Sequence, residues 1–435
     1  MQLPRISILT KGNTNYLIPF VLITVCFALW GFANDITNPM VKAFSKIFRM
    51  TTTEGTLVQV AFYGGYFAMA MPAALFIRRF SYKRGVLVGL GLYALGAMLF
   101  LPAKWSGVFE PFLLAYFIMT CGLSFLETSC NPYILSMGDA QTATRRLNLA
   151  QSFNPIGSLA GMFVAMNFIQ SRLHPMSTDE RMKLSDAAFE TVKEADLSVL
   201  VAPYLWIGIV ISILFVAVWL VKMPGHGDQS RPFAILPAVR HLISTARYRE
   251  GVIAQFFYVG AQICCWTFVI QYGTHLFVSR GMAEQEAEVL SQQYNIIAMA
   301  LFCASRFVCT FFLRYVKAAR LLAVLAVVAG VLTLGVIFFD HLLGLYCLIG
   351  VSACMSLMFP TIYGIALHGM GEEAKFGAAG LIMAILGGSL LPLLQAGIID
   401  MGEVMGVHGT NASFIVPLIC FVVVAVFGYR RLQED

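Results

Sequence analysis

The chain has 435 residues, of which 59% are hydrophobic and only 12% are charged, and its formal net charge is +6. Its mean hydropathy of +0.77 excludes a soluble globular protein and predicts a protein that crosses a membrane many times. The basic residues are dispersed over short polar segments rather than gathered in one run, so the positive charge does not indicate a nucleic-acid partner.

Long apolar runs recur along the whole chain. A helix needs about 20 apolar residues to cross a bilayer, and these runs are apolar all round, whereas barrel strands alternate between apolar and polar residues. We therefore expect an all-α membrane protein with twelve transmembrane helices in two pseudo-symmetric six-helix bundles. The predicted spans are residues 16–41, 56–77, 85–103, 109–137, 147–170, 200–222, 250–277, 288–313, 320–339, 342–367, 376–400 and 412–429.

The first span carries three polar side chains near its outer end. Asn34 and Asn38 are four residues apart and Asp35 and Asn38 are three apart, so their side chains project over a limited arc of one helix. We interpret Asp35 as a proton-coupling residue, and Asn34 and Asn38 as substrate ligands. The alternative for Asp35 is an acid that only faces the outside water at the end of the helix.

The fourth span contains an acid, Glu127, inside the largely apolar run of residues 112–137. It lies about eleven residues from the inner end, which is about 16 Å along a helix and near the middle of the membrane. A charge at that depth costs at least ~2.5–3.5 kcal/mol and survives mainly where it faces a water-filled path. Low dielectric disfavours the charged form of a carboxylic acid, so the acid holds a proton when occluded and releases it when water arrives.

We therefore predict that Glu127 is a proton-coupling residue. The alternative is a permanent ion pair with a basic residue, which would only lock two helices together. Asn131 lies one turn further along the same helix face and is a candidate substrate ligand.

The fifth span opens with a stripe of amides at intervals of three residues, formed by Asn148, Gln151 and Asn154. Each amide offers both a donor and an acceptor, which suits a pair of neighbouring sugar hydroxyls. We interpret Gln151 and Asn154 as sugar ligands. The same amides are equally compatible with hydrogen bonding between packed helices.

The seventh span has amides and aromatic side chains on one face. Gln255 and Gln262 are seven residues apart, Tyr258 lies between them, and Trp266 follows one turn later. An aromatic face beside amides fits a pyranose, whose C–H face stacks on the ring while its hydroxyls form hydrogen bonds. Gln255, Gln262 and Trp266 are therefore candidate substrate ligands, and helix packing is an equally good explanation.

Two polar residues lie inside the eighth span. Asn295 is a further candidate substrate ligand. Arg306 lies near the inner end, where we expect it to hold an inner gate by pairing with carbonyls or a carboxylate rather than to contact sugar.

The lysine and arginine residues are unevenly distributed over the loops. Most of the 29 fall on the side of both termini, which predicts cytoplasmic termini because basic loops stay in the cytoplasm. Lys42, Lys46 and Arg49 go against this rule, and we expect the first span to continue outward there as a polar-faced helix.

The two halves of the chain show signs of an internal repeat. A basic elbow follows the second span at residues 79–84 and the eighth span at residues 314–320. Residues 223–249 contain prolines and glycines and are interpreted as a cytoplasmic linker between an N-terminal bundle, residues 1–222, and a C-terminal bundle, residues 250–435. Two such halves predict rocking about a central binding site.

The residue types that build catalytic and metal sites are scattered. All ten cysteines lie within apolar segments and the seven histidines occur singly, so no nucleophile–base or metal-ligand spacing can be assembled. We expect no enzyme activity, no metal and no cofactor.

Six segments carry distinctive motifs: LWGFANDITNP, AFYGGYF, FLETSCNPYILSMG, RRLNLAQSFNPIGS, AQFFYVGAQICCW and MFPTIYGIALHGMG. They closely resemble the fucose permease group of the major facilitator superfamily, which contains bacterial sugar:proton symporters. The resemblance covers nearly the whole chain and implies the major facilitator fold, a multi-pass place in the bacterial inner membrane, and uptake of L-fucose or a related hexose with a proton. It also places Glu127 on the group's central protonatable acid, and Gln151 and Asn154 on amides of its sugar cavity.

The resemblance has one departure, in the first span. An L-fucose carrier of the group reads Ala-Asn-Asn-Leu-Asn-Asp where residues 33–38 of this chain read Ala-Asn-Asp-Ile-Thr-Asn, so the acid is displaced by almost one turn. The identity of the sugar therefore stays open. The alternative is a sodium-coupled or uniport carrier of glucose, galactose, mannose or N-acetylglucosamine. We expect a monosaccharide substrate, the proton as coupling ion, a lipid bilayer as surroundings and a functional monomer.

Overall fold

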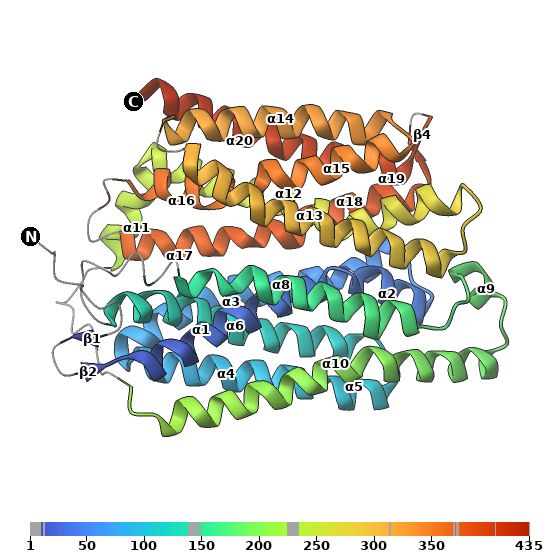
Figure 1. Cartoon of the computed structure of the whole chain (residues 1–435), viewed down its shortest axis with the longest axis horizontal. Helices are drawn as coiled ribbons and strands as arrows, with labels where there is room; N and C mark the ends of the chain where they lie inside the picture. Colours follow the sequence, from blue (N-terminus) through green and yellow to red (C-terminus); the bar gives the residue numbers. More distant parts are fainter. Residues whose placement is uncertain are drawn as a thin grey trace, which may run out of the picture.

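A computed structural model describes residues 10–11, 14–137, 146, 149–223, 235–312, 315–368, 370, 374–404 and 406–434. Nearly all of these residues are helical, and the long helices run roughly parallel to one another (Figure 1). The described strands are two short antiparallel pairs: β1 (Thr10–Lys11) with β2 (Thr14–Asn15), and β3 (Glu403–Val404) with β4 (Val407–His408). The expectation of an all-α protein is confirmed.

The helices of the first half of the chain form the lower layer of Figure 1. They are α1 (Leu17–Thr37), α2 (Met40–Phe48), α3 (Thr52–Arg79), α4 (Tyr82–Met98), α5 (Phe100–Ser106), α6 (Glu110–Ser136), α8 (Phe153–Val164), the π-helix η2 (Ala165–Ile169), the 3-10 helix η3 (Gln170–Arg172), α9 (Thr178–Met182) and α10 (Asp186–Leu220).

The helices of the second half form the upper layer of the same view. They are α11 (Ile235–Ser244), α12 (Ala246–Val278), α13 (Glu284–Phe312), α14 (Ala318–Phe338), α15 (Leu342–Met355), α16 (Met358–Leu367), α17 (Ala374–Met383), the 3-10 helix η5 (Ala384–Leu386), α18 (Gly387–Asp400), α19 (Gly409–Ala412) and α20 (Ile415–Glu434). We call α1–α10 the first helix group and α12–α20 the second helix group.

Eleven helical stretches of the described residues are long and apolar enough to cross a membrane. The remaining predicted span, residues 288–313, corresponds to α13, which has 29 residues and is therefore about 43 Å long at 1.5 Å per residue. Its first turns carry Glu284, Glu286 and Glu288, and these acids lower the hydropathy of that segment. The described residues thus contain a long helix at each of the twelve predicted spans.

A helix does follow the first span outward, as expected, but it is a separate element with a break at Asn38 and Pro39. Pro39 lacks a backbone N–H and cannot extend the ladder of α1, and a separate helix, α2, begins at Met40. Arg49 follows the last residue of α2 and has a positive φ of 54°. Its guanidinium lies 3.5 Å from the centroid of the Phe189 ring.

Close approach of α1 and α8 depends on glycine. A Cβ atom at Gly157 would overlap the main-chain carbonyl of Ala28, and one at Gly31 would overlap the carbonyl of Asn154. Small residues let transmembrane helices pack backbone to backbone. This packing fixes the height of α8, and with it the position of the amides of the fifth span.

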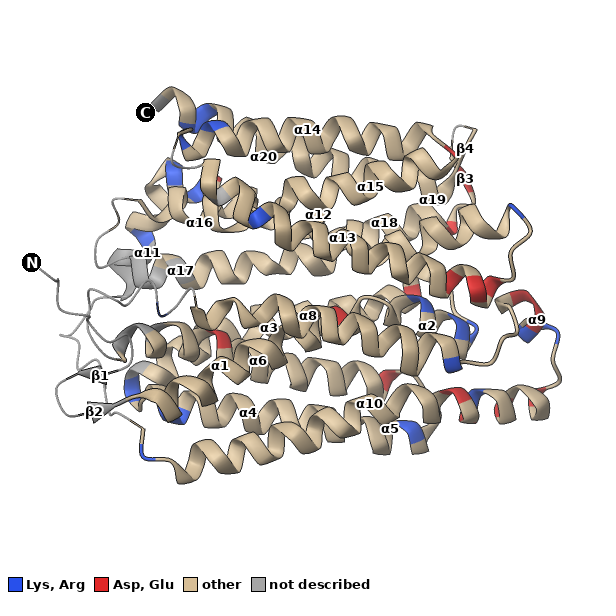
Figure 2. Ribbon diagram, in the orientation of Figure 1, with Lys and Arg blue, Asp and Glu red and all other residues tan. Residues whose placement is uncertain are grey.

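The two ends of the bundle differ in charge. Figure 2 shows mainly Lys and Arg at the end where α1 begins and α20 finishes, and many Asp and Glu at the opposite end, along the first turns of α10 and α13. We label the first the inner end and the second the outer end, following the orientation expected from the sequence. The asymmetry has the sense that the positive-inside rule describes.

Candidate functional site

Glu127 is buried in α6 and has no positive partner among the described residues. Its side chain is 7% exposed, its Oε2 accepts no hydrogen bond, and it forms no ion pair with a basic residue in the part of the chain that the structure describes. The alternative of a permanent ion pair therefore finds no described partner. An isolated carboxylate is costly to bury, so this environment favours the neutral, proton-carrying form.

The amides predicted around Glu127 lie next to it. Asn131 donates its Nδ2 to the main-chain oxygen of Glu127 at 3.1 Å, one helical turn away. The Oδ1 of Asn131 accepts from the Nε2 of Gln151 at 2.8 Å. These three residues, from the fourth and fifth spans, therefore form one polar group, and we call it the Glu127 group.

Two tyrosines lie between Glu127 and the second acid, Asp35. Tyr66 of α3 is near the carboxyl of Glu127, and Tyr63, one turn earlier, is near that of Asp35. The two rings stack with centroids 6.3 Å apart and an interplanar angle of 22°, and Tyr363 of α16 also faces Glu127. An aromatic row thus connects the surroundings of the two acids along the inside of the first helix group.

Asp35 lies in the last turn of α1 and is 3% exposed, so it does not face the outside water in this state. The Nδ2 of Asn38 donates to its Oδ1 at 3.2 Å, as the three-residue spacing suggested. Asn34 is half-buried on the same helix, and its Oδ1 has no hydrogen-bond partner among the described residues.

Two residues that sequence reasoning missed complete the surroundings of Asn38. The Oδ1 of Asn38 accepts from the Nε2 of Gln59 at 3.2 Å and from the Oγ1 of Thr267 at 3.5 Å. Gln59 also donates to Thr267 at 3.0 Å. Gln59 could have been found by the rule that singled out Glu127, because it is a polar residue inside an apolar span.

The remaining amide of the fifth span contacts backbone. Asn154 donates its Nδ2 to the main-chain oxygen of Phe27 at 3.1 Å and so ties α8 to α1. Asn148 lies outside the described residues. In this state Gln151, rather than Asn154, is the fifth-span amide that joins the Glu127 group.

In the second helix group, Trp266 and Asn295 lie together. The Nε1 of Trp266 donates to the Oγ of Ser352 at 3.2 Å, and its main-chain oxygen accepts from the Nδ2 of Asn295 at 3.3 Å. The Trp266 ring meets Phe302 edge to face, with centroids 5.0 Å apart. Trp266 thus packs α12 against α13 and α15, while the buried Oδ1 of Asn295 has no partner among the described residues.

The two glutamines of the seventh span differ in their surroundings. Gln255 is fully buried, and neither its Oε1 nor its Nε2 has a hydrogen-bond partner among the described residues. Gln262 is half-buried. Tyr258, between them, donates its hydroxyl to the main-chain oxygen of Met355 at 3.0 Å and so holds α12 to α15.

Arg306 contacts both backbone and an aromatic ring. Its Nε donates to the main-chain oxygen of Ser356 at 3.2 Å, and its guanidinium lies 5.0 Å from the centroid of Phe302. Ser356 is the residue at which α15 ends. Arg306 therefore contacts the break between α15 and α16.

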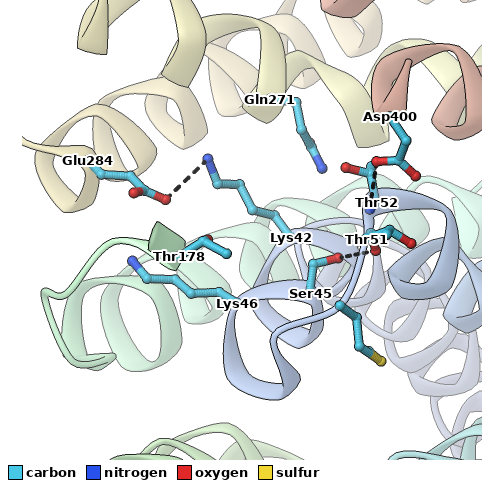
Figure 3. Close-up of a pocket in the computed structure, with 10 residues that line it drawn as sticks. Lys42, Ser45, Lys46, Thr51, Thr52, Thr178, Gln271, Glu284 and Asp400 are labelled. Carbon is cyan, nitrogen blue, oxygen red and sulfur yellow. Dashed lines mark hydrogen bonds and ion pairs between the residues drawn. The ribbon is translucent and has the colours of Figure 1, made fainter. Parts of the chain in front are cut away.

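The two helix groups are joined by ion pairs at the outer end, and Figure 3 shows the one between Lys42 and Glu284. The Nζ of Lys42 lies 3.9 Å from Glu284 and 3.4 Å from Glu288, and the Nζ of Lys46 lies 3.6 Å from Glu288. Lys46 and Glu288 are almost fully buried, with side-chain exposures of 2% and 4%. The basic residues that contradicted the positive-inside rule thus pair with acids of α13.

A carboxylate of α18 caps α3 at the same end. The two oxygens of Asp400 accept from the backbone N–H groups of Thr52 and Thr53 at 2.9 and 2.6 Å, where the helix dipole favours negative charge. A cavity of about 290 Å³ lies between these groups, and its wall includes Lys42, Gln271, Glu284 and Asp400.

Other hydrogen bonds between the two helix groups lie on the same side. Gln285 donates to the main-chain oxygens of Ser171 and Leu173 at 3.2 and 2.9 Å, and Ser389 donates to those of Gln59 and Val60 at 3.3 and 3.4 Å. Residues 52–60 and 171–173 belong to the outer parts of their spans. Among the described residues, the structure therefore has its outer end closed by polar contacts.

Comparison with known proteins identifies the family. Residues 23–393 match the model of the Major Facilitator Superfamily. The chain is 52% identical over 424 residues to the L-fucose-proton symporter of Haemophilus influenzae, which covers 95% of this chain and 96% of that protein. It is 31% identical over 429 residues to the L-fucose-proton symporter of Escherichia coli, with coverages of 97% and 94%.

More distant sugar carriers and a solved structure also match. A glucose/galactose transporter of Brucella abortus is 29% identical over 425 residues, covering 96% of this chain and 95% of that protein. The crystal structure of the transporter FucP in the outward conformation superposes with a TM-score of 0.72 at 30% identity, over 96% of this chain and 99% of that one.

Proposed function

The chain belongs to the Major Facilitator Superfamily, and we propose that it is a proton-coupled symporter that takes up L-fucose or a closely related hexose by alternating access. The observation that carries this proposal is the 52% identity to an L-fucose-proton symporter over 95% of the chain. The protein is a transporter and not an enzyme. Its coupling ion is the proton, and its substrate is a sugar.

Glu127 is the proposed central proton site. In the state open to the outside, water reaches the acid and it takes up a proton, which removes the cost of burying a charge when the carrier closes. In the state open to the inside, water from the other face takes the proton away. The absence of a described cation beside Glu127 supports this role, because a permanent partner would keep the carboxylate charged.

The sugar is held by amides and aromatic side chains from both helix groups. A buried polar atom without a partner costs about 1–3 kcal/mol, and sugar hydroxyls would satisfy such atoms. Those in question are the Oδ1 of Asn34, the Oε2 of Glu127, both ends of Gln255 and the Oδ1 of Asn295. Asn38, Asn131, Gln151, Asn154, Gln262 and Trp266 complete the proposed set, and Arg306 is proposed to brace the inner gate.

The proposed arrangement in the cell follows from the charge asymmetry. The protein lies in the bacterial inner membrane with both termini in the cytoplasm, and it works as a monomer in lipid. Residues 1–222 and 250–435 act as the two rocking bundles, and residues 223–249, which include α11, connect them on the cytoplasmic side.

A second candidate is a carrier of glucose or galactose. It is favoured by the 29% identity to a glucose/galactose transporter and by the displaced acid of the first span. Competition of unlabelled hexoses against labelled L-fucose, in a host without its own fucose transport, tests the sugar directly. We expect L-fucose to compete best, and stronger competition by glucose or galactose would replace the first candidate with the second.

Coupling to protons has its own test. Addition of the sugar to de-energised cells in a weakly buffered medium is expected to make the medium more alkaline, because protons enter with the sugar. Uptake that depends on sodium and leaves the medium unchanged would exclude proton symport.

A further inference from the structure

Asp35 and Asn38 of α1 are connected to the second helix group through Gln59 and Thr267. Asn38 donates to Asp35 and accepts from Gln59, each at 3.2 Å, and Gln59 in turn donates to Thr267 at 3.0 Å. All four side chains are buried, with exposures between 0% and 3%. Thr267 belongs to α12, so this hydrogen-bonded row crosses from one helix group to the other.

The hydrogen bonds from Gln59 and Thr267 set the orientation of the Asn38 amide. Its oxygen is occupied by the amide donor of Gln59 and by the hydroxyl of Thr267, so its nitrogen is the end left for Asp35. If the amide turned over, its nitrogen would face the donor of Gln59, and that contact is repulsive. Gln59 and Thr267 therefore hold Asn38 as a hydrogen-bond donor to the carboxyl of Asp35.

Other neighbours of Asp35 offer no compensating charge. The titratable groups that face it are the hydroxyl of Tyr63 on α3 and the thiol of Cys303 on α13, and both are neutral near pH 7. On α2, Lys42 and Lys46 are paired with the acids of α13. A donor held toward a carboxyl favours its ionised form, and the hydroxyl of Ser158 on α8 and the Asn38 amide both face Asp35. Ser158 belongs to the first helix group, so the Asn38 amide is the donor whose orientation depends on the second helix group.

The structure shows this arrangement together with a closed outer end. Because Thr267 lies in the second helix group, separation of the two groups on the outside would move it away from Asn38 and remove part of what orients the Asn38 amide. We propose that Gln59 and Thr267 are positioning residues for proton coupling, which make the proton affinity of Asp35 follow the conformational state. The inference rests on the proposed function, because it assigns Asp35 a proton that is carried with the sugar.

In the closed-outside state the Asn38 amide stabilises the ionised form of Asp35, so Asp35 releases its proton more readily. In the open-outside state the Asn38 amide is no longer held, and Asp35 binds a proton again. Without Gln59 or Thr267, Asp35 would meet similar surroundings in both states. Sugar exchange, which needs no net proton movement, would continue, and proton-driven accumulation would fall.

Ser389 provides a matched comparison. Its hydroxyl also crosses between the helix groups, and it also reaches α3 next to Gln59, but it donates to main-chain oxygens and does not touch Asn38. A role in closure alone predicts similar effects at Ser389 and Thr267, whereas a role in coupling predicts an effect at Thr267 only.

The test uses the full chain in proteoliposomes, with labelled L-fucose and two readouts: exchange without a pH gradient, and accumulation driven by an inside-alkaline gradient. Thr267→Val keeps the side-chain shape and removes the hydroxyl, Thr267→Ser keeps the hydroxyl, Gln59→Leu removes the amide, and Ser389→Ala is the control. Each of Thr267→Val and Gln59→Leu removes two hydrogen bonds of this row. We expect both to lower accumulation by about fivefold or more, with exchange within about twofold of the parent protein. Thr267→Ser and Ser389→Ala should keep both activities.

The outcomes separate this inference from the proposed function. If the parent protein accumulates no sugar on a pH gradient, the proposed function fails. If it does, but Thr267→Val accumulates normally or the serine variant is as defective as the valine variant, Gln59 and Thr267 are not coupling residues. Equal loss of exchange and accumulation in Thr267→Val and Gln59→Leu would also overturn the inference and show a structural role only.

Discussion

At the scale of single residues, the main feature is two buried acids that have no cationic partner among the described residues. Glu127 and Asp35 are 7% and 3% exposed, and neither forms an ion pair within the described part of the chain. Buried charges are normally paired or neutralised, so binding of a proton is the expected way to neutralise each acid. Their contacts differ, however, because Glu127 adjoins amides of the first helix group whereas Asp35 is also linked to the second.

Glu127→Gln imitates the protonated form permanently. We expect this variant to keep sugar exchange and to lose concentrative uptake, because it can neither bind nor release the coupled proton. Uptake and exchange of labelled L-fucose in proteoliposomes measure both activities. Glu110→Gln is the control, since Glu110 is an exposed acid in the first turn of the same helix, and accumulation by Glu127→Gln equal to that of the control would remove Glu127 from the mechanism.

The position of the first-span acid can be tested by swapping the residues at positions 35 and 38. Asp35→Asn should abolish accumulation, and adding Asn38→Asp should restore part of it, because the two side chains are in hydrogen-bond contact and the acid would move by less than one turn. The measurement is accumulation of labelled sugar by the single and double variants. Normal accumulation by Asp35→Asn alone would show that this acid is not needed.

At the scale of helices, the closed outer end depends on α2 and α13. The sequence places Lys42 and Lys46 where the positive-inside rule disfavours them, and the structure explains them by ion pairs with α13. Removing one partner of a buried ion pair costs about 3–5 kcal/mol, because the other charge stays buried and unpaired. The outer end should therefore open when this pair is broken.

Glu288→Gln breaks the buried pair with Lys46 and should shift the population toward the outward-open state. Spin labels at Ser106 and Ser279, which are exposed near the outer ends of α5 and α12, would report longer distances in this variant, in a background without native cysteines. Glu286→Gln, an exposed acid on the same turn of α13, should leave the distances as they are. Identical distance distributions for both variants would contradict a gating role of the pair.

Packing of α1 against α8 gives a separate prediction on stability. Gly157→Ala places a methyl group against the backbone of Ala28 and should cost about 1–3 kcal/mol, as overpacking does. Gly330→Ala in α14 meets only the tip of Leu418, at 3.7 Å, and should be neutral or slightly stabilising because alanine favours helix. Thermal unfolding of the purified variants in detergent compares them, and equal melting temperatures would argue against close packing of α1 and α8.

At the scale of the whole molecule, much of the fold could be predicted because apolar runs of sufficient length leave few alternatives to transmembrane helices. The contacts within one span or between neighbours, such as Asp35 with Asn38 or Glu127 with Asn131, followed from helical spacing. The link from Gln59 to Thr267 did not follow from helical spacing, because these two residues are 208 positions apart in the chain. Hydropathy also cannot reveal which end of the carrier is closed, since both states bury similar helix faces.

Symport of the sugar with a proton is the property on which the other predictions depend. Its most direct test is accumulation of labelled L-fucose in proteoliposomes by an inside-alkaline pH gradient, in buffers free of sodium. Proton symport predicts accumulation above equilibrium, and an ionophore that dissipates the proton gradient should abolish it. Accumulation that requires a sodium gradient, or entry that stops at equilibrium whatever the pH gradient, would contradict it.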